Sequence, residues 1–418
     1  MNINLQRKID RFLGTFLCRL FSLLPRRRNP LSGGPKPSKI LVILLSEMGS
    51  LVLARPMFHE IEKKYPRASI HVLLFKRNRE FLEILNVIPK ERIWGIDGES
   101  LMKMLKDSLL ALIRMRKEKI DTVIDCELFS RVSSLFSFLS GAKIRVGFHP
   151  YNQEGLYRGN FINRPVAYNP YRHISQQFMA LVEAIESMDV PRVKSQFKND
   201  KPKVPAIKMT KDEMSRLGGR LKGDFPQMGD KKLVLLYPSG GLLPIRAWPL
   251  KHFCLVAHEL IQQGHAVGII GMEADKDLAK GIISYCNNRN CIDLTGYTKT
   301  VRELMILFHF ASLLISNDGG PGHFASLTPV PTMVFYGPET PVLYGVLGDR
   351  AINFYIPLFC SPCLTAYNHR NSPCDGNNKC LKLIDPVLVI EKAFEILKDQ
   401  ESHVPSIKMI SDKHQGVS

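Results

Sequence analysis

The feature that most constrains this sequence is a rhythm of short apolar runs and longer amphipathic stretches, which occurs twice along the chain. Lys39–Leu45 (KILVILL) opens the first series, and further candidate strands follow at 69–75, 92–96, 121–125 and 144–148. Runs that are apolar at every position are typical of strands buried on both faces of a parallel sheet. Helical patterns separate these runs, at 51–64, 78–86, 99–118, 129–140 and 172–188. The series therefore predicts a doubly wound α/β domain.

A second series of the same kind follows a proline-rich interruption. Its candidate strands lie near 232–237, 266–270, 291–294, 312–316 and 331–335, and its candidate helices near 249–263, 274–286, 300–310, 321–327 and 386–398. A length of 418 residues suits two or three domains. We expect a leader and linker over 1–38, α/β domains over 39–190 and 231–398 joined by a linker over 191–230, and a tail over 399–418. Two such domains enclose a cleft, which is a favoured place for a ligand.

The first 39 residues carry nine basic side chains and a single acidic one, Asp10. This basic excess is almost half of the net charge of +18 of the whole chain. Apolar residues recur at spacings of three and four between Leu5 and Leu24 and form one stripe along a helix. An uninterrupted apolar stretch of about 20 residues, which a membrane span requires, is absent. The pattern predicts a basic amphipathic helix that contacts an anionic membrane surface through residues 3–28.

Other interpretations of this leader and of the charge stay open. The helix can instead pack on the body of the protein, or the segment can be a signal peptide, although Arg19 interrupts its apolar region and a small-residue cleavage site is lacking. A basic excess also suits nucleic acid. Because RNA and DNA do not require a continuous apolar face, we expect no nucleic-acid partner.

Four of the nine cysteines are clustered, with the spacing C-x2-C-x10-C-x5-C. This spacing can hold a tetrahedral structural zinc ion. A pair of disulfides in an oxidising compartment and a set of free surface thiols are the competing explanations. The expected structural metal site, without a part in catalysis, consists of Cys360, Cys363, Cys374 and Cys380, in a loop over 360–380.

The most informative motif is the polar, glycine-rich turn that follows the apolar run ending at Ser316. Pro321 stands where a new helix can begin, because proline suits the first helical turn. Free N–H groups and the positive end of the helix dipole make such a turn suitable for a phosphate group. Asp318 can cap the helix or accept a hydrogen bond from a sugar hydroxyl, and His323 can donate to a phosphate. The remaining candidates are Gly319, Gly320 and Gly322, which allow close approach to the backbone. The competing explanation is a plain corner with a core histidine.

Two further turns end strands of the same half. Pro238–Pro249 (PSGGLLPIRAWP) offers small residues, Ser239 and Gly240 among them, where open α/β sheets bind ligands, and its Arg246 can neutralise a diphosphate. Ile270–Glu273 (IGME) places the Glu273 carboxylate at the same edge, where it suits a ribose diol. The pattern G-x-G-x-x-G and the P-loop pattern are absent from these turns, which disfavours dinucleotide oxidoreductases and P-loop kinases.

Two carboxylates of the first half are candidate general bases. Glu47 lies on the loop after the first strand, and Asp125 ends the strand at 121–125, so both are expected at the cleft edge of the sheet. Glu47 can also be a structural residue, since an acidic side chain is favoured at the start of a helix.

These motifs together resemble glycosyltransferase family 9, the bacterial heptosyltransferase family of lipopolysaccharide assembly. The resemblance rests on Asn317–His323 (NDGGPGH), Val334–Pro341 (VFYGPETP), Arg246–Pro249 (RAWP), Gly271–Glu273 (GME), the Ser46-x-x-Gly49 loop and Val123–Cys126 (VIDC). It extends from about residue 39 to 398 and is more specific in the second half.

The resemblance implies a GT-B fold of class α/β, with two Rossmann-like domains that face a cleft. It also implies an inverting transfer, without a catalytic metal or other cofactor, from ADP-heptose or a related nucleotide-sugar donor to an anionic glycolipid acceptor of the lipopolysaccharide type. Asp318 to Gly322 and His323 would hold the pyrophosphate and the sugar, Arg246 would replace a usual lysine against the phosphates, and Glu273 would hold the ribose. The expected location is the bacterial cytoplasm, peripheral on the cytoplasmic face of the inner membrane.

One departure from the family pattern concerns the general base. Family members usually carry an aspartate after the glycine of the first loop, and this chain has Ser50 there. A serine hydroxyl is too weakly basic to take a proton from an acceptor hydroxyl, and a positioned base supplies about 10²–10⁴-fold in rate. We expect Glu47 to replace it, with Asp125 as the alternative. The departure also keeps open a non-catalytic nucleotide-sugar or glycan-binding protein, and the architecture keeps open a UDP-sugar epimerase.

Overall fold

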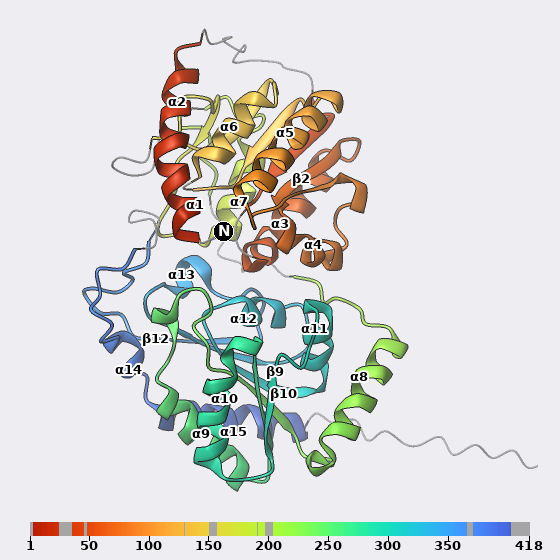
Figure 1. Ribbon diagram of the computed structural model, residues 1–418, viewed down its shortest axis with the longest axis vertical. Coiled ribbons are helices and arrows are strands. Elements are labelled where there is room, and N and C mark those ends of the chain that lie inside the picture. The colour runs from red at the N-terminus through yellow and green to blue at the C-terminus, as the bar shows by residue number, and fades with distance from the viewer. Residues whose placement is uncertain are drawn as a thin grey trace, which may run out of the picture.

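The computed structural model describes residues 3–24, 36–45, 48–128, 130–149, 157–189, 191–196, 204–365 and 371–402. Two α/β domains lie one above the other (Figure 1). The elements of the first are α1 (Ile3–Ile9), α2 (Thr15–Ser22), β1 (Lys39–Ile43), α3 (Met48–Lys64), β2 (Ser69–Phe75), α4 (Arg79–Leu85), β3 (Ile93–Ile96), α5 (Leu101–Lys117), β4 (Thr122–Asp125), α6 (Arg131–Leu139), β5 (Ile144–Phe148), β6 (Arg164–Val166) and α7 (Ile174–Glu183).

The second domain is built from the same kind of alternation. Its elements are α8 (Lys211–Asp224), β7 (Leu233–Tyr237), α9 (Leu250–Gln262), β8 (Ala266–Gly271), α10 (Lys276–Cys286), β9 (Cys291–Thr295), α11 (Val301–Phe310), β10 (Ala311–Asn317), α12 (Gly320–Ala325), β11 (Thr332–Tyr336), α13 (Pro341–Tyr344), β12 (Ala351–Tyr355), α14 (Lys379–Lys382) and α15 (Pro386–Ser402). The helix α8 falls inside the segment over 191–230 that the sequence predicts as a linker, and a Thr210–Glu213 capping box starts it.

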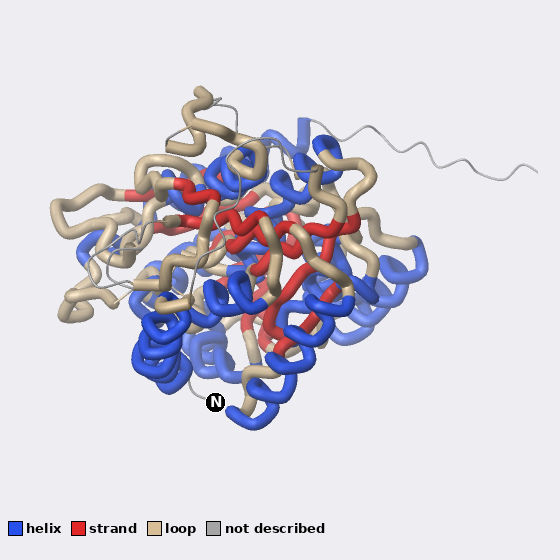
Figure 2. The backbone as a smooth tube through the Cα atoms, turned by 90° about the horizontal axis from the view of Figure 1, so that it is seen from above, coloured by secondary structure: helices blue, strands red, loops and turns tan. Residues whose placement is uncertain are grey.

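Both sheets have six parallel strands in the same order. The first runs β3-β2-β1-β4-β5-β6 and the second β12-β11-β10-β7-β8-β9, so each follows the doubly wound pattern in which the first strand lies at the centre. The central strands are buried on both faces because they are apolar throughout. Figure 2 shows the strands enclosed by helices. The predicted pair of Rossmann-like α/β domains is confirmed.

The helices α5 and α6 cover one face of the first sheet, because Ala111, Met115 and Phe136 share a core with alternate residues of β1. The helices α3 and α7 pack together over the other face. In the second domain, the Trp248 ring stacks on Phe335 and fills the core beneath the turn that follows β7. The carboxyl ends of the strands of each sheet meet at one edge, where the following loops carry the candidate site residues.

The N-terminal helical segment packs against α6 with one side and exposes the other. A π-helical turn at Asp10–Gly14 joins α1 to α2. The Asp10 carboxylate accepts hydrogen bonds from the backbone N–H groups of Arg131 (2.9 Å) and Val132 (3.0 Å), which open α6, and it pairs with the Arg131 guanidinium at 3.3 Å. Burial raises the pKa of Asp10, and these donors oppose the rise. No described helix is both long enough and apolar enough to cross a bilayer.

Candidate functional site

The strand–turn–helix motif predicted around residue 318 is present, and Asn317 holds it in place. The buried Asn317 side chain accepts a hydrogen bond from the Trp248 backbone N–H (2.9 Å) and donates to the Pro238 carbonyl (2.8 Å). It thereby joins the turn after β10 to the turn after β7. The short helix α12 starts at Gly320 with Pro321 in its first turn, as expected. Sequence reasoning did not assign a role to Asn317, although the residue opens the motif.

Arg246 lies buried at the centre of the second domain's cleft edge, between two buried carboxylates. Its Nη2 donates to Glu339 Oε2 at 2.7 Å, and its Nε lies 3.6 Å from Asp318 Oδ2. The structure therefore brings together two residues that the sequence predicted, Arg246 and Asp318. The structure also places Glu339 in this cluster. The only sequence signal for Glu339 was that it is the single acidic residue in the segment GPETP after β11. Since two acids surround one guanidinium, Arg246 is held in a fixed position at this edge.

The remaining residues of this edge shape the turn around Arg246. Ser239 is buried, and its hydroxyl accepts from the Gly241 N–H at 3.1 Å. A Cβ at Gly240 would lie 2.8 Å from the Leu243 carbonyl oxygen, so only glycine fits there. Burial raises the pKa of the Tyr237 hydroxyl, whose ring lies beside Gly319.

Glu273 lies at the same edge but apart from the Arg246 cluster. It is exposed, follows β8 in a 3-10 turn at Glu273–Asp275, and pairs with Lys276. The Lys276 ammonium group holds the pKa of Glu273 below its usual range. Gly296 faces this carboxylate without a side chain. The arrangement leaves Glu273 accessible to a ligand that extends outward from Arg246.

His323 and Gly49 form a direct contact between the two domains. His323 is buried in α12, and a Cβ placed on Gly49, in the first turn of α3, would lie only 2.8 Å from its Cδ2 atom. Beside them, the Phe324 ring packs on Phe81 of α4 with centroids 4.7 Å apart. The absence of a side chain at Gly49 therefore allows the first turn of α3 to meet α12. Ser50, where the family has its aspartate, is the next residue in α3.

The two candidate bases are placed differently. Glu47 lies outside the described residues. Asp125 is fully buried at the end of β4, where Arg158 Nη2 donates to it at 2.5 Å and the Ser133 hydroxyl donates to it at 3.0 Å. Burial raises the pKa of Asp125, and the guanidinium of Arg158 opposes that rise. With its oxygens engaged inside the domain, Asp125 is positioned to hold the fold of this edge.

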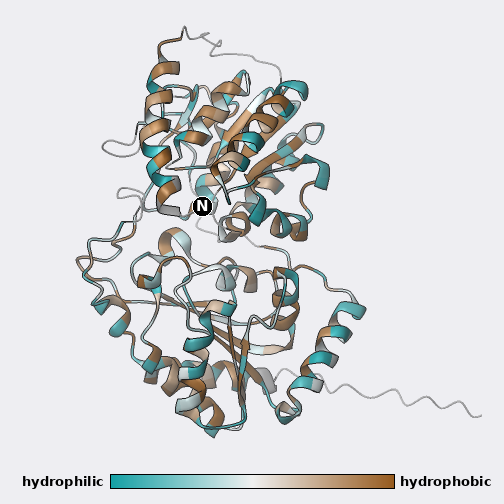
Figure 3. Ribbon diagram, in the orientation of Figure 1, coloured by the Kyte–Doolittle hydropathy of each residue, from teal (hydrophilic) through white to brown (hydrophobic). Residues whose placement is uncertain are grey.

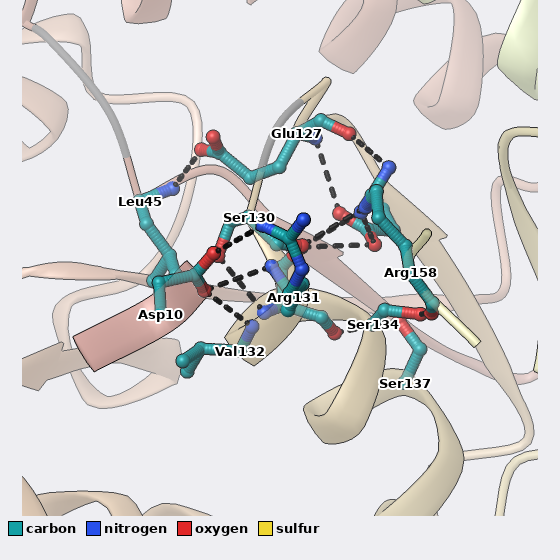
Figure 4. A network of polar contacts seen from close by, with 11 residues as sticks. Asp10, Leu45, Glu127, Ser130, Arg131, Val132, Ser134, Ser137 and Arg158 are labelled. Atoms are coloured by element: carbon teal, nitrogen blue, oxygen red, sulfur yellow. Dashed lines mark hydrogen bonds and ion pairs between the residues drawn. The ribbon is translucent and has the colours of Figure 1, made fainter. Parts of the chain in front are cut away.

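A further acid, Glu127, contacts the loop that contains the predicted base. Glu127 is buried, and its Oε1 accepts a hydrogen bond from the Leu45 backbone N–H at 2.7 Å. Its own carbonyl oxygen accepts from Arg158 at 2.6 Å (Figure 4). The acids that end β4 thus fix the position at which the loop after β1 leaves the sheet. Sequence reasoning missed Glu127, which has no motif of its own.

Each of the nine cysteines is a free thiol in the structure. Of the clustered four, Cys380 is buried, Cys363 is half-buried, and Cys360 and Cys374 are exposed. Within the described part of the chain, no three His, Cys, Asp or Glu side chains converge closely enough to hold a metal ion. Burial, with the other three thiols nearby, raises the pKa of Cys380 to about 11. The zinc site stays a prediction.

The comparisons with known proteins agree with this geometry. A family model described as glycosyltransferase family 9 (heptosyltransferase) matches residues 110–372. The chain is 23% identical to lipopolysaccharide heptosyltransferase 2 of Salmonella typhimurium over 375 residues, which are 87% of this chain and 99% of the relative. It is also 23% identical to lipooligosaccharide heptosyltransferase 2 of Haemophilus ducreyi over 320 residues, 75% of this chain and 87% of the relative.

Two solved structures share the fold. The structure of E. coli ADP-heptose lps heptosyltransferase II has a TM-score of 0.66 at 20% identity and covers 87% of this chain and 99% of its own. A glycosyl transferase family 9 structure from Veillonella parvula also has a TM-score of 0.66, at 19% identity, and covers 87% of this chain and 97% of its own. The two-domain α/β architecture is thus the GT-B fold of these enzymes. Because the family model spans more than half of the residues, this chain belongs to glycosyltransferase family 9, the heptosyltransferase family.

Proposed function

We propose that this enzyme transfers a heptose from ADP-heptose to the core of a lipopolysaccharide or a related glycolipid, with inversion at the anomeric carbon. Relatives aligned over nearly their whole length carry the name lipopolysaccharide heptosyltransferase 2, and the fold of an ADP-heptose enzyme covers most of the chain. The observation that carries the proposal is the contact of Gly49 with His323, by which the first turn of α3 in the first domain meets α12 in the second.

On the donor side, the buried Arg246 neutralises the diphosphate as it leaves. Arg246 is already fixed by Glu339 and Asp318, so little reorganisation is needed when negative charge develops on the leaving group. Asp318 accepts a hydrogen bond from a sugar hydroxyl, and the backbone from Gly319 to Gly322 faces the phosphates. The exposed carboxylate of Glu273 binds the ribose diol.

On the acceptor side, a carboxylate removes the proton from the attacking hydroxyl. The oxygen then forms a bond to the anomeric carbon, and the bond to the diphosphate breaks with its electron pair on the departing oxygen. Ser50 cannot take this proton, so we assign the general base to Glu47. Asp125 acts as a positioning residue, because it forms a buried ion pair with Arg158.

The acceptor is lipid-anchored, so the enzyme works at a membrane. We place it on the cytoplasmic face of the bacterial inner membrane, held as a peripheral protein through residues 3–28. In the described part of that segment, Phe12, Phe16 and Leu23 are exposed, although Asp10 and Cys18 pack on the protein body. The helix thus has one side on the protein and a second side free to contact lipid.

The test is an assay of ADP release from ADP-heptose, with and without a core glycolipid acceptor, on the full chain. We expect release that depends on the acceptor, and a loss of about 10²–10⁴-fold in kcat for Glu47→Gln. ADP binding, followed by thermal shift, should survive in this variant. The matched control is Glu99→Gln, an exposed acid that is paired with Lys103.

Two results would contradict the proposal. Tight nucleotide binding without turnover of any donor would favour the non-catalytic binding protein. A wild-type rate in Glu47→Gln would show that the assignment of Glu47 as the general base is wrong, while the proposed transfer reaction would still hold.

A rescue experiment supports the location of the base. If adding Ser50→Asp to the Glu47→Gln variant restores turnover, the base acts from this end of α3.

A further inference from the structure

The helix α5 carries a stripe of apolar side chains that point away from the sheet. Met102, Leu105, Leu109 and Ile113 follow one another at spacings of three and four residues, so they share one side of the helix. They are 53% to 77% exposed. The opposite side of α5 is buried in the core beneath it. We call these four residues the α5 stripe.

Exposed apolar stripes of this length mark an interaction surface, because scattered single residues are the normal case for a soluble protein. The side chains around the α5 stripe are basic and exposed, and they are Lys103, Lys106, Arg114, Arg116 and Lys117. The acid within the helix, Asp107, pairs with Lys76 at 2.8 Å. The surroundings of the stripe are therefore net positive.

A cavity of about 400 Å³ adjoins the far end of the α5 stripe. Four cations line it, Arg79, Lys90, Arg114 and Lys117, with the acids Glu91 and Glu118. Glu118 is engaged by Lys39 at 2.8 Å. Arg79 and Lys90 both pair with Glu83. The positive surroundings of the helix therefore continue to the end of the stripe through Arg114 and Lys117.

The N-terminal helix repeats this pattern in the same layer of the domain. Between α1 and the residue that follows α2, Phe12, Phe16, Leu20 and Leu23 are exposed. Lys8 of α1, Arg11 of the π-helical turn and Arg19 of α2 are exposed basic residues. The segment runs parallel to α6, since Gly14 meets Arg131 and Phe21 meets Phe138. Figure 1 shows α2, α6 and α5 next to one another, and Figure 3 shows apolar residues along α2 and α5.

We propose that the α5 stripe is a second membrane-docking surface, which works together with the N-terminal helix on a bilayer with anionic headgroups. An interfacial helix buries its apolar side at the boundary between headgroups and acyl chains, while lysine and arginine side chains reach back to the phosphates. The exposed apolar side chains and the positive surroundings of α5 meet both requirements. The basic residues select a negatively charged surface.

This docking surface also orients the cleft. The helix α5 begins directly after the carboxyl end of β3, so Leu101 and Met102 lie at the cleft edge of the first sheet. Asp10 lies at the same edge, because it contacts the start of α6. Both apolar stripes therefore run from the cleft edge along the domain, and docking brings the mouth of the cleft to the lipid surface. In this respect the inference rests on the proposed lipid-anchored acceptor.

The test is co-sedimentation of the full chain with vesicles of phosphatidylethanolamine and phosphatidylglycerol, compared with neutral phosphatidylcholine vesicles. The quadruple variant Met102→Gln, Leu105→Gln, Leu109→Gln, Ile113→Gln should lose about 10- to 100-fold in partition onto anionic vesicles, from the transfer of exposed apolar area. Neutralising Lys106, Arg114 and Lys117 to Gln should weaken binding to anionic vesicles alone, and added salt should mimic that effect.

The matched control lies on the other domain, where Leu383, Val387 and Leu388 are 54% to 57% exposed. Their substitution by Gln should leave vesicle binding unchanged. Unfolding midpoints of all variants should agree within a few degrees, since the changed side chains are exposed. Wild-type vesicle binding in the α5 variants would overturn the proposal, and so would self-association of the wild-type chain through α5 in sedimentation.

The outcome is separable from the proposed function. Turnover of a delipidated, water-soluble core acceptor does not require docking, so the α5 variants should match the wild type in that assay. If the wild-type enzyme showed no turnover of this soluble acceptor, the transferase proposal would be contradicted. The result of the vesicle experiment would still hold.

Discussion

The contact between Gly49 and His323 predicts a specific defect for Gly49→Ala. The new Cβ would lie 2.8 Å from Cδ2 of a buried ring, whereas carbon atoms are in favourable contact at about 3.5 Å. The histidine or the whole loop must therefore move by about 0.7 Å. Overpacking of this kind costs about 1–3 kcal/mol, while alanine in a helix regains about 1 kcal/mol relative to glycine.

These two effects nearly cancel in stability but not in activity. We expect the unfolding midpoint of Gly49→Ala to fall by only a few degrees, because about 1 kcal/mol corresponds to about 2–4 °C in domains of this size. A displacement approaching 1 Å at the reacting groups costs about 10²-fold in rate. The kcat/KM for acceptor-dependent ADP release should therefore fall by about 10- to 100-fold.

The control for Gly49→Ala is Gly219→Ala in α8, where a new Cβ meets nothing within 4 Å. That change should stabilise the protein by about 0.5–1 kcal/mol and leave kcat/KM unchanged. In a His323→Ala background the clash is absent, so Gly49→Ala should cause little additional loss. A Gly49→Ala enzyme as active as the wild type would refute the assignment of this contact to the site.

Three further predictions follow from buried or paired groups. Arg246→Lys keeps the positive charge but loses the planar guanidinium group that contacts two carboxylates. Calorimetry should therefore show ADP binding about 10-fold more weakly. An unchanged affinity for ADP would count against a role of Arg246 in binding the donor. A hydrogen bond from Arg302 lowers the pKa of Glu213 from its usual 4.5 to about 2. The ionised Glu213 carboxylate therefore contributes its full stabilisation of the fold above pH 4.5, and this contribution is lost as the pH falls toward 2. Glu213→Gln should lower the free energy of unfolding by about 1–2 kcal/mol at pH 7 and flatten the urea-measured acid dependence in that window. For the clustered thiols, we expect elemental analysis to find one metal ion per purified chain. Chelation, or the substitution Cys380→Ser, should lower the unfolding midpoint. A metal content near zero would contradict the prediction.

The sequence was sufficient to predict the positions of most strands along the chain because apolar runs are local signals. The strand β6 was missed because it has only three residues and contains Pro165. The strand β12 was missed because it is a half-buried edge strand. The helix α8 does have a local signal, the Thr210–Glu213 capping box, but the surrounding prolines and lysines masked it.

The candidate site was predicted in its donor half, where a motif is contiguous in the chain. Its acceptor half depends on partners that are distant in sequence. Nothing near Asp125 indicates that Arg158, 33 residues later, neutralises it in the interior. Likewise, the lone acid Glu339 gave no sign that it would hold Arg246, 93 residues away. Charge pairing inside a fold follows from topology, and a single sequence does not contain that information in a local form.

The N-terminal helix also has buried contacts with the first domain, so a test of membrane binding has to keep them. Deleting residues 1–37 would remove lipid contacts, but it would also remove the Asp10 carboxylate from the buried Arg131 and uncover Leu135 and Phe161. Removing the carboxylate partner of a buried guanidinium costs about 3–5 kcal/mol, so weak membrane recovery of the truncated chain would mix lost anchoring with lost structure. Replacing Phe12 of the π-helical turn and the exposed apolar residues of α2 by glutamine leaves the packed side intact. Only that substitution separates a helix that binds lipid from one that merely completes the domain.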